Sequence, residues 1–443
     1  MKERVYIHSL GCPKNQVDAE VMAGLLAGSG YEMVPGPEEA EVIVVNTCAF
    51  ILSAKQEAVE EILTMAGWKE RGACRRLIVT GCLPQRYGRV LEKEMPEVDL
   101  FLGTGDFPRI VELLRKSGRS SRRSFVGRPR FLMDAGHHRL LAPSPASAYL
   151  KVAEGCSNRC SYCVIPRIRG KFRSRPPEDV LEEAEALALA GVKEVVLVAQ
   201  DTTAYGRDLA GRPLLADLLR ELAAVPGFRW IRFLYAYPSS VTDELLEVVA
   251  REEKVCKYID IPVQHIDDGI LRAMKRKGGS AEVRDAVGRI RRMVPEAVLR
   301  TSVIVGFPGE TAARFNRLLE FVEEARFENL GAFTYSREEG TEAAGLAYQV
   351  SERVKEKRRD LLMERQAAIS FEVNRRRIGR VEEVLLEGET GDPVFPLLGR
   401  TRTQAPEVDG FTYVRAKKGE IGDIVFCRVV DADTYDLYAE ETS

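Results

Sequence analysis

Apolar runs alternate with amphipathic segments over the first 115 residues of the chain. Continuously apolar runs are typical of strands buried on both faces, and apolar residues three and four apart indicate helices. Ser53 and Gln56 have the spacing of a capping box at the start of one helix. The alternation predicts a small doubly wound α/β domain. Its predicted strands are Val5–Leu10, Val42–Val45 and Leu77–Val79, and its predicted helices are Val17–Leu26, Ala54–Ala66 and Phe107–Arg115.

Six further strand patterns alternate with helical patterns after a segment rich in Ser, Arg, Gly and Pro. Six βα units in about 225 residues predict a partial (βα)6 barrel with a parallel sheet. The strands are expected at Tyr149–Ala153, Glu194–Ala199, Ile231–Tyr235, Tyr258–Val263, Leu299–Val305 and Leu330–Tyr335.

A charged helix over Glu352–Arg376 precedes the last segment, where short strands are separated by turns such as Gly391-Asp392 and Asp409-Gly410. This pattern predicts a small antiparallel β-barrel. The overall fold class is therefore α/β with a C-terminal β-barrel. The expected divisions are an N-terminal domain at 1–118, a basic linker at 119–145, the barrel domain at 146–376 and the terminal β-barrel at 377–443.

The composition is that of an ordinary soluble globular protein, with 45% hydrophobic and 30% charged residues among 443. No apolar run has the roughly 18 residues that a membrane span needs, and the start of the chain lacks the apolar core of a signal peptide. A cytoplasmic protein that makes no membrane contact is expected. Its nine cysteines are then metal ligands or buried thiols in preference to disulfides.

The segment Cys156-Ser-Asn-Arg-Cys160-Ser-Tyr162-Cys163 follows the first predicted barrel strand. Three thiolates at this spacing, here called the barrel triad, can hold three irons of a 4Fe–4S cluster and leave the fourth iron open to a ligand. A structural zinc site is the alternative, but zinc takes four protein ligands and no further Cys or His is near in the sequence.

Three other cysteines, here called the N-terminal triad, each come two or three residues after a predicted strand: Cys12, Cys48 and Cys82. Because the carboxyl ends of parallel strands share one edge of the sheet, these thiols are expected to converge and to hold a second cluster. Taken singly, each could equally be a buried free thiol. Cys74 precedes its strand and is expected at the opposite edge, whereas Cys256 and Cys427 are expected to be core thiols.

The barrel triad resembles the signature of the radical-SAM superfamily, Cys-x-x-x-Cys-x-aromatic-Cys. The resemblance implies that S-adenosylmethionine (SAM) chelates the open iron and that its reductive cleavage gives a 5′-deoxyadenosyl radical. It also implies SAM contacts at Gln200, after the second barrel strand, and at Ile304 and Gly306, around the end of the fifth. Gly309 stands where the superfamily often has a glutamate, and Glu310 follows it.

Two cysteine triads, in an α/β domain and a partial barrel that precede a β-barrel, resemble the methylthiotransferase family through essentially the whole chain. The terminal domain then looks like a TRAM module. The resemblance implies two 4Fe–4S clusters and two uses of SAM. One SAM methylates sulfur bound at the open iron of the N-terminal cluster, and another supplies the radical that takes hydrogen from an unactivated carbon. Capture of the methylthio group by that carbon requires both clusters to face one cavity.

One branch of this family modifies an adenosine in tRNA, and another modifies the β-carbon of an aspartate in protein twelve of the small ribosomal subunit. Residues 11–15, Gly-Cys-Pro-Lys-Asn, resemble the ribosomal branch, as do residues 199–203, 261–265 and 335–341. The prediction is methylthiolation of that aspartate, with a reducing donor such as flavodoxin or ferredoxin and ribosomal RNA as further partners. The tRNA enzyme and a non-catalytic ribosome-binding iron–sulfur protein are the alternatives.

Charge is unevenly distributed along a chain whose net charge is only −2. From residue 378 onwards, 14 acidic residues stand against seven basic ones, which disfavours RNA and suits a basic ribosomal protein, although an acidic solvated surface is the alternative. Residues 115–130 hold seven basic residues and no acidic one, which indicates either an RNA contact or a solvated linker. The cations from Arg167 to Arg175 are candidates to bind a SAM or substrate carboxylate. His265 is expected to be either a catalytic residue or a hydrogen-bonded rim residue.

Overall fold

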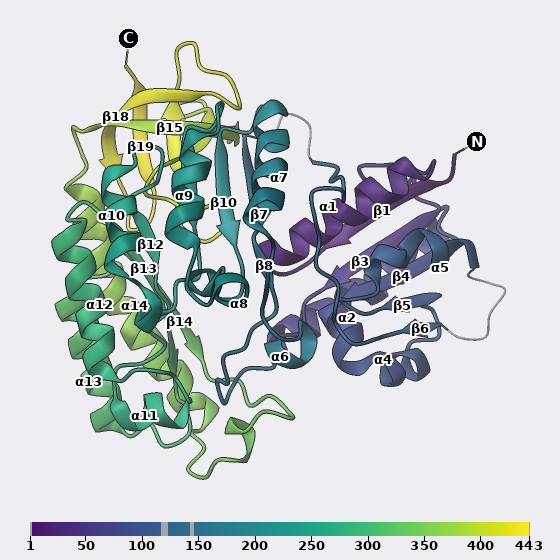
Figure 1. Ribbon diagram of the computed structural model, residues 1–443, viewed down its shortest axis with the longest axis horizontal. Coiled ribbons are helices and arrows are strands. Elements are labelled where there is room, and N and C mark those ends of the chain that lie inside the picture. The colour runs from purple at the N-terminus through teal and green to yellow at the C-terminus, as the bar shows by residue number, and fades with distance from the viewer. Residues whose placement is uncertain (1, 117–122, 142–145, 443) are drawn as a thin grey trace.

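The computed structural model describes residues 2–116, 123–141 and 146–442 (Figure 1). The N-terminal domain contains a parallel sheet with the strand order β2-β1-β3-β4-β5-β6. Every residue of Val42–Thr47 is buried, which confirms the prediction of a strand covered on both faces. The strands are β1 (Arg4–Ser9), β2 (Glu32–Met33), β3 (Val42–Thr47), β4 (Arg76–Gly81), β5 (Leu100–Leu102) and β6 (Ser124–Phe125).

Helices cover both faces of this sheet, so the prediction of a doubly wound domain is confirmed. Helices α1 and α5 pack on the face that carries Val42 and Val44, whereas α2 and α4 pack on the face that carries Ile43 and Val45. The predicted capping box is wrong, because α2 begins before Ser53 and has no side-chain cap. The helices are α1 (Pro13–Gly28), α2 (Leu52–Ala66), α3 (Trp68–Arg71), α4 (Cys82–Glu94), η1 (Phe107–Arg109) and α5 (Ile110–Lys116).

The second domain is the predicted partial barrel, in which all six main strands are parallel. They form two three-stranded sheets, β11-β10-β7 and β12-β13-β14, and a parallel bridge between Ile231 and Val255 joins the two. A short hairpin of β8 with β9 follows the first strand. The strands are β7 (Ser147–Lys151), β8 (Ala153–Glu154), β9 (Arg173–Ser174), β10 (Glu194–Val198), β11 (Trp230–Phe233), β12 (Tyr258–Asp260), β13 (Val298–Val305) and β14 (Asn329–Thr334).

Helices surround the outside of the barrel, and α14 packs along β14 at its far side. Helix α14 is the charged helix expected from the sequence. The helices of this domain are α6 (Ile165–Ile168), α7 (Pro177–Leu189), η2 (Thr202–Ala204), α8 (Arg207–Ala210), α9 (Leu215–Ala224), η3 (Pro238–Ser240), α10 (Asp243–Arg251), α11 (Asp268–Ala273), α12 (Ser280–Met293), α13 (Ala312–Ala325), η4 (Ala343–Gly345) and α14 (Glu352–Arg375).

The last segment closes into a five-stranded barrel in the order β15-β16-β17-β19-β18. The predicted β-barrel is confirmed, except that the pairing of β17 with β19 is parallel while the other pairings are antiparallel. The parallel pair forms because β18 lies between β17 and β19 in sequence but outside them in the sheet. The strands are β15 (Val381–Glu389), β16 (Leu397–Thr401), β17 (Thr412–Arg415), β18 (Ile424–Ala432) and β19 (Leu437–Glu441).

The N-terminal domain docks its α1 against β7 of the barrel (Figure 1). One apolar cluster runs from α1 and the N-terminal sheet through Val196, Val198 and Leu234 inside the barrel to Leu385 of the last domain. A shared core of this kind fixes the relative position of the three parts. None of the described helices is long and apolar enough to cross a membrane. The domain limits at 118/119 and 145/146 adjoin segments outside the described residues and, like the limit at 376/377, stay predictions.

Candidate active site

The N-terminal triad lies at the carboxyl edge of the first sheet. Cys12 caps α1 just after β1, Cys48 follows β3 directly, and Cys82 is the first residue of α4 after β4. Because β1, β3 and β4 are neighbours in the sheet, the three cysteines sit side by side at one edge, as the strand pattern predicted. Cys74 comes before β4, at the other edge, as expected.

Two glycines let the backbone pass close to the side chains around the three thiols. Gly11 has φ +96°, and a β-carbon there would lie 2.8 Å from Cβ and 3.4 Å from Sγ of Cys48. Gly81, with φ +95°, adjoins Cys82 in the same way, since a β-carbon would lie 2.6 Å from Oδ1 of Asn46. Both positions therefore need glycine, for the conformation and for the space.

The thiols of this triad lie close enough to influence one another. Burial raises the pKa of the Cys82 thiol to about 12, the neighbouring Cys48 and Cys12 add to this, and the Arg169 guanidinium opposes it. Burial also raises the pKa of Cys12, but the positive charges of Lys14 and Arg169 outweigh it, so this pKa lies below its usual value. The site thus combines three thiols with two buried cations.

The barrel triad lies in the loop between β8 and β9, above the carboxyl end of the first barrel strand. The Cys156 amide donates to the Gly170 carbonyl at 3.0 Å, and the Cys163 amide donates to the Cys160 carbonyl at 3.1 Å. Burial raises the pKa of Cys163 to about 12, and the neighbouring Cys160 and Cys156 raise it further. All three cysteines therefore lie in one loop, close enough for the pKa of one thiol to depend on the others.

The residues expected to contact SAM lie around this loop. The Gln200 amide donates to Glu154 at 3.3 Å, and its buried oxygen has no hydrogen-bond partner within the described ranges. Ile304 packs in an apolar cluster with Tyr162 of the cysteine loop. Gly306 instead lies against the side chain of Lys355, and its amide donates to Glu310.

Glu310 has a structural task at the end of β13. Its carboxylate accepts hydrogen bonds from the amides of Gly306 and Phe307 and lies 3.3 Å from Arg358. Burial raises the pKa of Glu310 to about 7 even though Arg358 opposes the change. The carboxylate therefore fixes the turn after β13.

A buried network of charged groups joins the two triads. Arg169 pairs with Asp18 at 2.6 Å, contacts Asn15, and lies 3.9 Å from the Cys82 sulfur. It also lies 3.4 Å from Glu154, which precedes Cys156 by two residues. Lys151 bridges the same two carboxylates, Asp18 and Glu154. The network was not expected from the sequence, because its members come from three separate segments of the chain.

This network corrects the hypothesis for the cations from Arg167 to Arg175. Arg169 and Arg175 are buried and already paired with carboxylates of the chain, so they are not free to bind a SAM or substrate carboxylate. Only Arg167 and Lys171 of the set are exposed. Sequence reasoning also missed Asp201, whose carboxylate accepts from Asn158 of the cysteine loop at 2.7 Å.

His265 is fully buried, and its Nδ1 accepts a hydrogen bond from the Asp267 amide at 2.9 Å. Burial lowers the pKa of His265 to about 4, so the ring is neutral at pH 7. Of the two roles considered for it, the hydrogen-bonded one fits. Cys256 and Cys427 are buried in apolar clusters, as predicted.

The acidic tail is largely committed to contacts within the chain. Glu383 pairs with Arg229 and Arg402, Glu387 pairs with Arg400, and Asp409 lies 3.4 Å from Arg300. The expectation of a free acidic docking face is therefore wrong for these carboxylates. Composition could not show this, because it does not say which face of the barrel meets the core.

The residues present fit two clusters. Each triad offers three thiols. At Gly11 the absence of a side chain leaves space beside the Cys48 sulfur, and the Gln200 oxygen, which has no partner within the described ranges, can accept a hydrogen bond from a bound group. In the described ranges, no three His, Cys, Asp or Glu side chains converge as they would on a single metal ion. The cysteine ligands of a 4Fe–4S cluster lie farther apart than the ligands of a single ion, since each thiolate binds its own iron.

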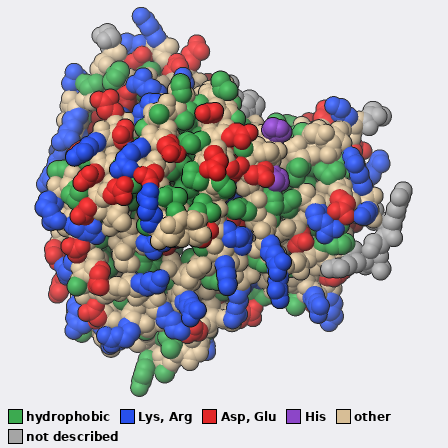
Figure 2. Space-filling view, in the orientation of Figure 1, with side chains coloured by type: hydrophobic (Ala, Val, Ile, Leu, Met, Phe, Trp, Pro, Cys, Tyr) green, Lys and Arg blue, Asp and Glu red, His purple; other side chains and the backbone are tan. Residues whose placement is uncertain are grey.

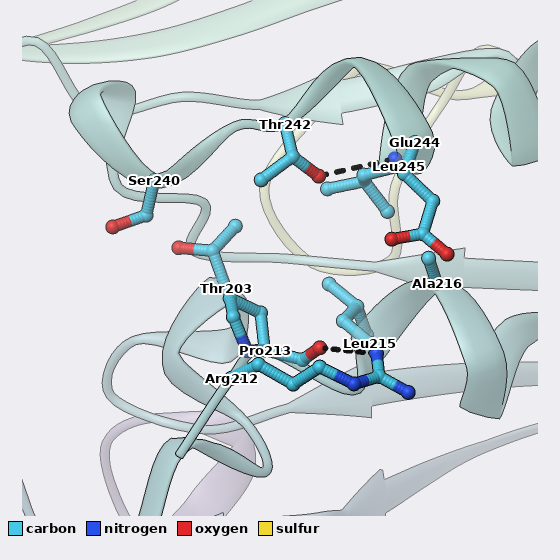
Figure 3. A pocket seen from close by; sticks show the side chains of 9 residues that line it. All are labelled: Thr203, Arg212, Pro213, Leu215, Ala216, Ser240, Thr242, Glu244 and Leu245. Atoms are coloured by element: carbon cyan, nitrogen blue, oxygen red, sulfur yellow. Dashed lines mark hydrogen bonds between the residues drawn. The ribbon is translucent and has the colours of Figure 1, made fainter. Parts of the chain in front are cut away.

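Figure 3 shows a separate pocket of about 100 Å³ beside α9 and α10, lined by residues such as Thr203, Arg212 and Thr242. Ligand sites of drug-sized molecules are several times larger, about 300–1,000 Å³. No cysteine lines this pocket, so it is not part of the site described above.

Comparisons with known proteins divide the chain as its fold does. Residues 4–103 match an uncharacterized protein family, UPF0004, residues 150–322 match the radical SAM superfamily, and residues 378–441 match the TRAM domain. The barrel triad lies inside the radical SAM match, and the N-terminal triad lies inside the first match. The chain thus contains a radical SAM domain between two other domains.

Solved structures share the fold at low identity. The radical SAM methyltransferase TsrM from Kitasatospora setae matches with a TM-score of 0.55 and 15% identity, over 89% of this chain and 82% of that one. The cobalamin-dependent radical enzyme OxsB matches with a TM-score of 0.51 and 13% identity, over 83% of this chain and 56% of that one.

Curated relatives are much closer. The ribosomal protein uS12 methylthiotransferase RimO of Syntrophus aciditrophicus is 58% identical over 99% of this chain and 98% of its own length. The protein of the same name from Geobacter sulfurreducens is 53% identical with the same coverage. The chain therefore belongs to the RimO family of ribosomal protein uS12 methylthiotransferases.

Proposed function

We propose that this chain transfers a methylthio group to the β-carbon of an aspartate in uS12, which is protein twelve of the small ribosomal subunit. The observation that carries the proposal is the placement of both cysteine triads at the junction of two parallel sheets, with one buried network between them. Both relatives described above bear the name of this activity. SAM serves as methyl donor and as radical source.

We assign a 4Fe–4S cluster to each triad. Cys156, Cys160 and Cys163 would hold three irons of the cluster in the barrel, which when bound and reduced would supply the electron for cleavage of SAM to a radical. The chain's own residues position the parts. Asn158 and Asp201 tie the cysteine loop to the end of β10, and Gln200 offers a buried amide oxygen to a SAM donor group. Ile304 and Tyr162 pack against the same apolar cluster.

The buried network keeps the two triads in register. Arg169 holds Asn15 and Asp18 of α1 on one side and Glu154 of the cysteine-loop hairpin on the other. Its charge beside Cys82 also favours a thiolate ligand there, because an opposite charge stabilises the anion. Lys151 and Arg169 neutralise two carboxylates inside the junction, so neither Asp18 nor Glu154 is buried without a cation beside it.

Other partners follow from the surface. Lys and Arg side chains gather around α6 on the face drawn in Figure 2, and Arg128, Arg130, Arg167 and Lys171 are exposed near this junction. We assign a contact with ribosomal RNA to this basic rim, because RNA affinity depends on Lys and Arg near phosphates. Electrons would come from a reducing protein such as flavodoxin or ferredoxin. The place of action is the cytoplasm, where ribosomes are found.

Iron content and SAM cleavage test the assignment of the triads. The reconstituted chain is expected to hold about eight irons, from two 4Fe–4S clusters. Changing Cys12, Cys48 and Cys82 to Ala should halve the iron and leave 5′-deoxyadenosine formation measurable. Changing Cys156, Cys160 and Cys163 to Ala should also halve the iron but abolish cleavage. A variant without the N-terminal triad that kept all its iron would refute the second cluster.

A further inference from the structure

Lys14 differs from the other buried basic residues of the chain. Seven Lys or Arg residues in the described ranges are less than 9% exposed, and six of them form an ion pair with a carboxylate. Those six are Lys151, Arg169, Arg175, Arg232, Lys355 and Arg400. Lys14, at 8% exposure, has no described carboxylate within ion-pair distance.

The ammonium of Lys14 lies between the two cysteine-bearing edges. Lys14 is two residues after Cys12, in the first turn of α1, the helix that docks against β7. Its Nζ lies 3.8 Å from the ring centroid of Tyr235, which follows β11 at the carboxyl edge of the barrel. Tyr235 has φ +64°, a conformation rare for a bulky residue and often retained where function requires it.

The surroundings of this ammonium are incomplete as an ion site. A cation over an aromatic ring gains a modest stabilisation, which is smaller than the cost of burying an unpaired ammonium. A buried ammonium that is oriented over Tyr235 at the mouth of the barrel, and that no described carboxylate pairs with, is suited to an anion that arrives with the substrate.

We infer that Lys14 binds the carboxylate of the substrate aspartate. This inference rests on the proposed function and names the group that selects its substrate. The β-carbon of an aspartate is bonded directly to the carboxylate carbon, so an anchored carboxylate holds the reacting carbon within one bond. The position of Lys14 next to Cys12 then brings that carbon to the edge where the N-terminal triad lies.

A simpler role for Lys14 would be to balance the negative charge of the cysteine ligands. The two roles differ in what they predict for the substrate. A charge-balancing lysine affects cluster loading but is indifferent to the substrate side chain, whereas a carboxylate anchor discriminates aspartate from asparagine. Substrate discrimination is therefore the readout that separates them.

The test measures binding of recombinant uS12 to the reconstituted holoenzyme with SAM and without reductant, so that no turnover occurs. Two forms of uS12 are compared: the native protein and the form with the target Asp changed to Asn, the target being located by mass spectrometry of the modified product. The wild-type enzyme should bind the Asp form about tenfold to a hundredfold more tightly, as expected of a buried charge-assisted contact.

Lys14→Met should bring this ratio close to one, and Lys14→Arg, which keeps the charge, should retain most of it. Lys257→Met is the matched control, because Lys257 is half-buried at the opposite edge of the barrel and donates to backbone carbonyls. It should leave the ratio unchanged. Iron content is measured for each variant.

If the wild-type enzyme binds the Asp and Asn forms of uS12 equally tightly, the inference is overturned. This result needs no enzyme variant, so it holds even if a variant folds poorly. An iron-loaded Lys14→Met that keeps the wild-type ratio would overturn it as well. Failure of the proposed function looks different: wild-type enzyme with reductant would leave the Asp form of uS12 unmodified, and the inference would fall with it.

Discussion

Glu194 joins the barrel to the terminal domain at the edge opposite the cysteines. Its carboxylate is fully buried and accepts from Arg232 at 2.8 Å and from Arg400 of β16 at 2.6 Å. Burial alone would raise its pKa, but Arg400 and Arg232 lower the pKa from 4.5 to about 2. The carboxylate therefore contributes to stability above the ordinary pKa of Glu, and this contribution is lost as the pH falls towards 2.

The size of the contribution follows from that pKa. A tenfold change in proton affinity is worth about 1.4 kcal/mol, so a pKa near 2 corresponds to about 3 kcal/mol at pH 7. In other proteins, removal of one partner of a buried ion pair lowers the free energy of unfolding by about 3–5 kcal/mol, which agrees with this value. Glu194→Gln should therefore destabilise the chain by about 3 kcal/mol, since Arg232 has no other carboxylate partner among the described residues.

Calorimetry measures the effect. A loss of 3 kcal/mol should lower the Tm of the transition that includes the barrel by about 6–12 °C, if the unit holds about 150–250 residues. Glu372→Gln is the control, because Glu372 is half-exposed and pairs only with surface arginines. The Tm of this variant should fall by about 2 °C or less. Equal Tm values for the two variants at pH 7 would refute the reasoning.

Three other predictions concern the site and its supports. Gly11→Ala should lose about half of the iron, because its β-carbon would meet Cys48, whereas Gly28→Ala, which has open space, should keep it; iron analysis of both decides. Burial opposes ionisation of Glu338, but Lys55, Ser336 and Arg86 outweigh it and lower its pKa, so its contribution holds above about pH 4 and is lost in more acidic solution. Glu338→Gln should therefore shrink the difference in Tm between pH 7 and pH 3, and an unchanged difference would contradict this. Cys-to-Ala changes at three cysteines outside the triads should leave the iron count unchanged, and a lost cluster in any of them would show that the triads are wrongly assigned: Cys74, Cys256 and Cys427.

Local patterns predicted the fold because each one reports a property of its own segment. The apolar run at Val42–Val45 was predictable because burial on both faces leaves a continuous apolar trace in the sequence. The convergence of Cys12, Cys48 and Cys82 was predictable for a topological reason, since parallel strands end at one edge.

Contacts between distant segments were not predictable from such patterns. In the sequence Arg169 is one cation in a basic stretch, and its neighbouring residues do not indicate that Asp18 and Glu154 neutralise it. The tail acids read as a charged surface, although Glu383 and Glu387 face arginines inside the molecule. The spacing of Ser53 and Gln56 predicts a capping box, but Ser53 lies inside α2, which begins at Leu52 and has no side-chain cap.

The most direct test of the account is mass spectrometry of recombinant uS12 after anaerobic incubation with the reconstituted chain, SAM and dithionite. The account predicts that uS12 gains one methylthio group in place of a hydrogen, that fragmentation places it on an aspartate, and that the enzyme without the N-terminal triad adds none while still forming 5′-deoxyadenosine. Unmodified uS12 in a reaction where the wild-type enzyme forms 5′-deoxyadenosine would contradict it.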